Sequence, residues 1–259
     1  MRDPLELSGK VVIVTGGSQG VGRGITTCFL GAGAEVVICD IEEPEELPSE
    51  GGRRALFTLA DVRDVEQIER VVTFTTEQLG RLDVLVNNAG GAPVADSATA
   101  SPRFSEAMIR LNLIAPLLFA QQANAVMQKQ EEGGVIINIA SVSAVRPSPG
   151  TAAYGAAKAG LLSLTQTLAV EWAPKVRVNA VTAGMILTEK AKLHYGDEEG
   201  VAAVAKTVPL GRMARPEDVG NTCLYLASPL ASYVSGAQIL MHGGGEKPAY
   251  MAVAKGTSS

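Results

Sequence analysis

The sequence has few cysteines, and their spacing is not that of a metal site. Its 259 residues include three, Cys28, Cys39 and Cys223, each inside an apolar segment and none in a CxxC pair. An odd number of scattered cysteines indicates neither a disulfide framework nor a zinc site. We therefore expect reduced thiols in the core and no bound metal.

The sequence also lacks a long apolar run and a basic stripe. The opening residues, MRDPLELSGK, contain no apolar stretch, and no later run approaches the roughly 20 residues of a membrane-spanning helix. The 22 basic and 27 acidic residues give a net charge of −5. These absences favour a cytoplasmic protein that binds neither membranes nor nucleic acid.

Apolar residues are abundant, at 46% of the chain, and many form short β-branched runs. Seven runs are predicted strands, at residues 10–15, 35–39, 55–60, 83–87, 135–140, 176–181 and 237–241. Stretches of helical period lie between them, near 21–32, 64–79, 104–130, 152–173 and 216–227. Most of the runs are continuously apolar, as in strands covered on both faces.

This alternation predicts an α/β fold with one Rossmann-type domain, in which a doubly wound parallel sheet of about seven strands carries helices on both faces. We expect the domain to span 1–247, with a substrate lid near 185–208 and a flexible tail over 248–259. Ligands of such sheets bind along the edge where the strands end. Glycines, carboxylates and amides follow most of the predicted strands, so this edge is the expected site.

A glycine-rich turn follows the first strand. Gly16, Gly20 and Gly22 lie between this strand and a helix, where backbone can approach a pyrophosphate at the helix N-terminus. Asp40 ends the second strand, where a carboxylate can accept ribose hydroxyls and would repel a 2′-phosphate. Because its neighbours Gln19 and Ile41 are uncharged, the pattern favours NAD over NADP, with Arg23 as the nearest base.

The same segment permits another enzyme class. Residues 16–20, GGSQG, match the G-x-S-x-G elbow of serine hydrolases, and the HGGG sequence at 242–245 resembles an oxyanion loop. An elbow, however, follows several strands, whereas Ser18 follows the first. A hydrolase using Ser18 is therefore kept only as an alternative.

Tyr154 and Lys158 stand out in an otherwise small and apolar helix. Thr151 is a plausible N-cap, and the two side chains then share one face near the helix N-terminus. A nearby ammonium, the helix dipole and a cationic nicotinamide would all lower the pKa of the tyrosine. The pair could equally be a half-buried tyrosine beside a structural lysine.

Taken together, TGGSQGVG (15–22), NNAG (87–90), Ser141 and YGAAK (154–158) resemble the short-chain dehydrogenase/reductase family, from about Leu7 to Gly245. The resemblance implies that Tyr154 is the general acid/base, that Lys158 lowers its pKa and holds the nicotinamide ribose, that Ser141 binds the substrate oxygen and that Asn112 holds a relay water. It implies cofactor contacts from Gly16, Ser18, Gln19, Gly20, Val21, Gly22, Asp40, Ile41, Asp61, Val62, Asn88, Ala89, Gly90, Tyr154, Lys158, Gly184, Ile186 and Thr188. Ala183 departs from the family, which usually has proline there.

The resemblance implies hydride transfer between NAD(H) and a secondary alcohol or ketone. Candidate substrate contacts are Ser143, Met185, His194 and Tyr195, and the substrates left open include hydroxyacyl thioesters, steroid or alicyclic alcohols and small diols. A dinucleotide-sensing regulator without catalysis is the alternative from another class.

Two further expectations concern the helix predicted at 104–130. Pro116 has no N–H, which frees the Asn112 carbonyl to bind an ordered water. The stretch 111–127 is apolar nearly all round, and small residues line the next helix. This pattern suits the homotetramer typical of the family.

Overall fold

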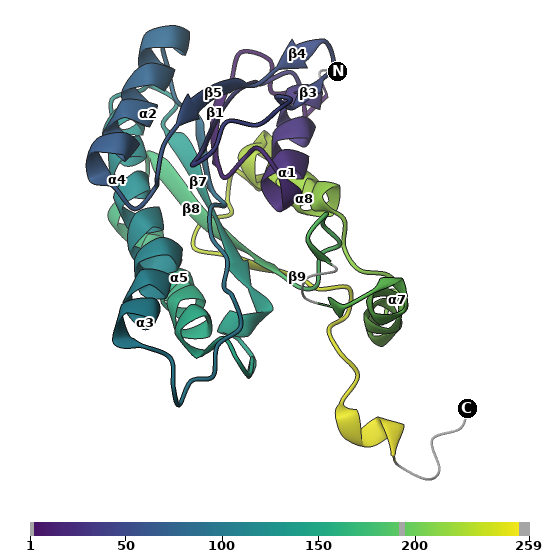
Figure 1. Cartoon of the computed structure of the whole chain (residues 1–259). Helices are drawn as coiled ribbons and strands as arrows, with labels where there is room; N and C mark the ends of the chain where they lie inside the picture. The colour runs from purple at the N-terminus through teal and green to yellow at the C-terminus, as the bar shows by residue number, and fades with distance from the viewer. Residues whose placement is uncertain (1–2, 192–194, 254–259) are drawn as a thin grey trace.

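The computed structural model describes residues 3–191 and 195–253. At its centre is a seven-stranded parallel sheet in the order β5-β2-β1-β6-β7-β8-β9 (Figure 1). The strands are β1 (Val11–Thr15), β2 (Glu35–Asp40), β5 (Leu56–Leu59), β6 (Val84–Asn87), β7 (Gly134–Ser141), β8 (Val176–Ala183) and β9 (Gln238–Met241). The seven predicted strands and the predicted fold are confirmed.

Helices cover both faces of the sheet, as the continuously apolar strands predict (Figure 1). On one face, α1 (Gly20–Gly31) and α8 (Pro216–Ala227) pack over Val12 and Val14. On the other face, α2 (Val65–Leu79), α4 (Ala115–Met127) and α5 (Ala152–Glu171) enclose Ile13. Alternate residues of β1 thus enter two separate cores. Across the described ranges, no helix is long and apolar enough to cross a membrane.

The helix predicted over 104–130 is interrupted. The structure has α3 (Pro102–Ile109), a π-helical turn at Arg110–Ile114, and then α4. In that turn the Ala115 N–H donates to the carbonyl of Arg110, five residues back. Pro116, at the start of α4, has no N–H to continue the regular pattern. The break at Asn112 is therefore built into the sequence.

Among the described residues, the strands of one hairpin and one α-helix were not predicted. A short hairpin joins β3 (Ser49–Glu50) to β4 (Arg53–Arg54), and α7 (Glu198–Thr207) forms part of the predicted lid. The carboxylate of Asp197 caps α7 by accepting the Gly200 N–H at 3.0 Å. The expected tail includes a 3-10 turn, Ala249–Ala252, on a segment that projects from the body of the molecule (Figure 1).

The three cysteines are free thiols. Cys39 and Cys223 are buried, and Cys28 is half-buried between α1 and α8. Burial raises the pKa of Cys39 to about 12 and that of Cys28 to about 11. Such thiols remain protonated at neutral pH and serve as core residues.

Candidate active site

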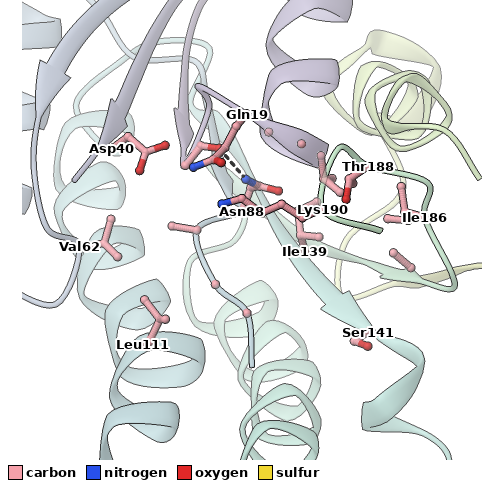
Figure 2. Close-up of a pocket in the computed structure, with 18 of the residues that line it drawn as sticks. Gln19, Asp40, Val62, Asn88, Leu111, Ile139, Ser141, Ile186, Thr188 and Lys190 are labelled. Carbon is pink, nitrogen blue, oxygen red and sulfur yellow. Dashed lines mark hydrogen bonds between the residues drawn. The ribbon is translucent and has the colours of Figure 1, made fainter. Parts of the chain in front are cut away.

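A cavity of about 530 Å³ opens along the carboxyl edge of the sheet, around the switch point between β1 and β6 (Figure 2). All predicted cofactor residues except Ser18 line it, as do the catalytic candidates Ser141, Tyr154 and Lys158. The cavity thus brings together segments that lie far apart in the sequence, from the glycine-rich turn to the start of the predicted lid.

The glycine-rich turn forms one wall of the cavity and depends on glycine. A Cβ on Gly22 would lie 1.9 Å from the carbonyl oxygen of Gly16, and Gly16 itself has a φ of +63°. The Asn88 amide donates to the carbonyls of Thr15 and Gly16 at 2.9 and 3.1 Å, which fixes the turn. Figure 2 draws the second of these bonds as a dashed line. The N-terminus of α1 therefore opens on a backbone cradle that fits a pyrophosphate.

Asp40 lies at the end of β2, where its carboxylate is held in place. One oxygen accepts the Ile41 N–H at 2.9 Å, and the other accepts the Ser18 hydroxyl. Ser18 is buried, supports Asp40 and does not line the cavity, so a cofactor contact from it stays a prediction. A hydrolase nucleophile needs an exposed hydroxyl beside a base, which argues against that alternative.

Ser141, Tyr154 and Lys158 converge from β7 and the first two turns of α5. The Ser141 hydroxyl lies close enough to Tyr154 to act on the pKa of the phenol. The ammonium of Lys158 lies 5.7 Å from the centre of the Tyr154 ring and donates to the Ile139 carbonyl at 2.8 Å. Tyrosine and lysine therefore face the same cavity, as their spacing predicts.

The pKa of Tyr154 is raised in this structure, so Lys158 and the helix N-terminus do not lower it by themselves. The sequence-based expectation also includes a cationic nicotinamide. Burial raises the pKa of the phenol, and the nearby Ser141 hydroxyl only opposes this effect. Burial also lowers the pKa of Lys158 to about 8. The phenol therefore stays protonated and can donate a proton. To act as a base it needs additional positive charge nearby, which would lower its pKa.

The predicted N-cap position of α5 is confirmed at Thr151, but the capping bond is absent. Thr151 occupies the cap position but makes no side-chain cap bond, because its hydroxyl donates to the Ser148 carbonyl at 2.9 Å. The same loop engages Ser143, whose hydroxyl donates to that of Ser148 at 3.0 Å. Ser143 does not line the cavity, so a substrate contact from it stays a prediction.

Asn112 is fully buried behind the cavity wall. Its amide donates to the Gly91 carbonyl at 3.0 Å, and its oxygen accepts the Gly91 N–H at 3.1 Å. A Cβ on Gly90 would lie 2.6 Å from that oxygen and 3.4 Å from the Lys158 nitrogen, so Asn112 and Lys158 flank the same glycine. Asn112 is thus connected to Lys158 through Gly90 and Gly91, in the loop after β6.

The remaining candidates belong to the predicted lid, 185–208. Met185 lines an adjoining cavity, Tyr195 lies near the charges of Arg146 and Glu246, and His194 lies outside the described residues. Several lining residues were missed, namely Cys39, Ala60, Arg63, Gly91, Leu111, Ile139, Ala140, Ala183, Glu189 and Lys190. Most of them are next to predicted residues in the sequence, and this adjacency could have identified them.

Comparisons with known proteins agree with this geometry. A family model described as enoyl-(acyl carrier protein) reductase matches residues 16–246. The oxidoreductase UcpA of Salmonella typhimurium is 34% identical over 96% of this chain and 98% of its own. The 3-oxoacyl-[acyl-carrier-protein] reductase FabG of Thermotoga maritima is 36% identical over 93% of this chain and 99% of its own. The ligand-free aldohexose dehydrogenase of Thermoplasma acidophilum superposes with a TM-score of 0.86 at 28% identity, covering 98% of both chains.

Proposed function

The chain belongs to the short-chain dehydrogenase/reductase family, and from this premise we propose that it transfers a hydride between NAD(H) and a secondary alcohol or ketone. The observation that carries the proposal is the convergence of Ser141, Tyr154 and Lys158 on one cavity beside the glycine-rich cradle. A bound nicotinamide would supply the hydride acceptor or donor.

The protein's own residues then handle the proton and the substrate oxygen. Ser141 donates a hydrogen bond to that oxygen and steadies its changing charge. Tyr154 takes the hydroxyl proton during oxidation and returns it during reduction. Lys158 supplies positive charge, and Asn112 fixes the loop at Gly90 against which Lys158 lies.

NAD is the proposed cofactor because the charge around Asp40 is unfavourable for a 2′-phosphate. Its carboxylate, held by Ser18 and Ile41, is ready to accept ribose hydroxyls. Arg63 lines the cavity, but its guanidinium is paired with Asp61 at 2.6 Å. Arg23 donates to the carbonyls of Ser18 and Glu46 and is not part of the lining.

We also propose a substrate class, an assembly and a location for the protein. The apolar surroundings of the site favour a hydroxyacyl thioester or a steroid or alicyclic alcohol over a small diol. The exposed stripe of small residues on α5, at Ala152, Ala156, Ala159 and Ser163, fits a homotetramer. The charge and composition favour a cytoplasmic protein.

Replacing the phenol tests the reaction and separates it from the regulator alternative. We expect Tyr154→Phe to lose more than about 99% of turnover because no group remains to move the proton, while NADH still binds. The measurements are alcohol turnover with NAD⁺ and NADP⁺ and ketone turnover with NADH and NADPH, beside NADH fluorescence titration. Full turnover by the variant would contradict the assignment. A wild-type protein that binds NADH but turns over no substrate would favour the regulator.

A further inference from the structure

A second cavity adjoins the first on its substrate side. It encloses about 320 Å³ and meets the cofactor cavity at Gly184, which lines both. Val142 and Met185, which directly follow Ser141 and Gly184 in the chain, form part of its wall. A substrate whose oxygen reaches Ser141 would therefore extend its remaining atoms into this second cavity.

The second cavity has an apolar wall and a charged rim. Val142, Val145, Met185 and Leu240 supply the apolar surface. At the rim, the Arg146 guanidinium donates to the Glu246 carboxylate at 2.5 Å, which connects the loop after β7 to the segment after β9. Such a surface suits a molecule that is apolar along its length and polar at its far end.

The lid also reaches this rim. Burial raises the pKa of Tyr195, and the positive charge of Arg146 lowers it while the negative charge of Glu246 raises it. Both charges therefore act on a residue three positions before α7. A ligand that engages Arg146 would lie near this residue.

A ligand anion could replace the Glu246 carboxylate as the partner of Arg146. Their side chains are 38% and 39% exposed, so solvent screens the attraction and the pair adds little stability. A substrate anion enclosed by the apolar wall is screened less, and a carboxylate or phosphate can accept two parallel hydrogen bonds from a guanidinium. Glu246 belongs to the chain segment that leaves the body of the molecule (Figure 1).

We propose that the second cavity holds the apolar part of the substrate and that Arg146 binds an anionic group, a carboxylate or a phosphate, at its far end. The inference rests on the proposed function, because it requires the reacting carbon at Ser141 and Tyr154. The substrate class is then an apolar secondary alcohol with an anionic end, such as a hydroxy acid or a hydroxyacyl thioester on a phosphate-bearing carrier. Arg146 determines specificity and takes no part in the chemical step.

The test measures binding without turnover. The acid used is 7-hydroxyoctanoate, whose secondary hydroxyl and carboxylate lie at opposite ends of an apolar chain. NADH and this acid are both reduced, so their complex with the enzyme cannot react, and NADH fluorescence follows its formation. We expect Arg146→Ala to weaken binding of the acid roughly 10- to 100-fold and to leave its methyl ester unchanged. Glu246→Gln should tighten binding of the acid, because it frees the guanidinium. A parallel titration with 7-hydroxyoctanoyl coenzyme A identifies the anion, because an effect confined to it assigns Arg146 to phosphate.

Arg53→Ala is the matched control. Arg53 pairs with Glu35 at the same 2.5 Å and with similar exposures of 37% and 42%, but neither residue lines the two cavities. This variant should bind all three ligands like the wild type. Equal losses for acid and ester in Arg146→Ala, or no loss for either anion, would overturn the inference alone. Failure of the wild type to bind NADH would overturn the proposed function and this inference with it.

Discussion

At the scale of single residues, the charge of Lys158 links the site to stability. The side chain is buried, which lowers its pKa from 10.5 to about 8. Between these two values the unfolded chain binds more protons than the folded one, so stability rises with pH. The cost of burying this ammonium is therefore complete below about pH 8 and disappears as the pH rises through 10.5.

Lys158→Met removes this titration. We expect the stability of the variant relative to wild type to be greatest below about pH 8 and to decline by on the order of 3 kcal/mol by pH 10.5. Urea unfolding of the cofactor-free protein over this range measures the difference. Lys206→Met, which alters an exposed lysine of α7, should show no such trend. A difference for Lys158→Met that does not vary with pH would contradict the prediction.

Spacing predicted which catalytic residues meet, but not how they are bound. Tyr154 and Lys158 share a face because they are one helical turn apart. The carbonyl that accepts the Lys158 ammonium belongs to Ile139, on a strand 19 residues earlier. The Ser18 contact with Asp40 likewise depends on how two strand ends pack side by side. A local pattern does not encode such partners.

At the scale of secondary structure, the break between α3 and α4 positions Asn112. The apolar pattern over 104–130 predicts one helix, and Pro116 signals a disturbance without giving its form. The π-helical turn results from a change of backbone partners, which side-chain pattern does not reveal. The short hairpin was missed because its strands contain only polar residues. Helix α7 was missed because its apolar residues are mostly alanines, whose small side chains give a weak periodicity.

Pro116→Ala would restore an N–H at the break. The helix could then return toward regular hydrogen bonding and move Asn112 away from Gly91, so we expect kcat to fall roughly 10- to 100-fold. The melting temperature should change by only a few degrees, roughly the effect of 1 kcal/mol or less. Turnover assays and thermal unfolding measure the two effects.

Pro102→Ala is the control, because Pro102 begins α3 outside the break. It should leave kcat unchanged. A Pro116→Ala enzyme with wild-type turnover would show that the break does not position Asn112. The ordered water expected on the Asn112 carbonyl remains a prediction for a cofactor-bound crystal, and a regular, dry helix there would refute it.

At the scale of the whole molecule, the sequence predicted the sheet and its functional edge but leaves the assembly open. Strands buried on both faces have a distinctive apolar pattern, as the fully buried β1 and β6 illustrate. The surfaces through which subunits contact one another have no comparable sequence pattern. Within one chain α4 already buries Phe119, Ala123 and Met127, so its apolar character is only partly available to a partner.

The exposed stripe on α5 tests the tetramer directly. Ser163 lies on this stripe and is exposed, so Ser163→Arg should fold normally but hold apart two subunits that meet across α5. We expect light scattering after size-exclusion chromatography to give a tetramer of 26.9 kDa subunits for the wild type and smaller species for the variant. Thr73→Arg is the control. It introduces an arginine at an exposed position of α2 and should remain tetrameric. Because α5 also carries Tyr154 and Lys158, loss of the interface should lower turnover together with mass. An unchanged mass for Ser163→Arg would exclude α5 as the subunit interface.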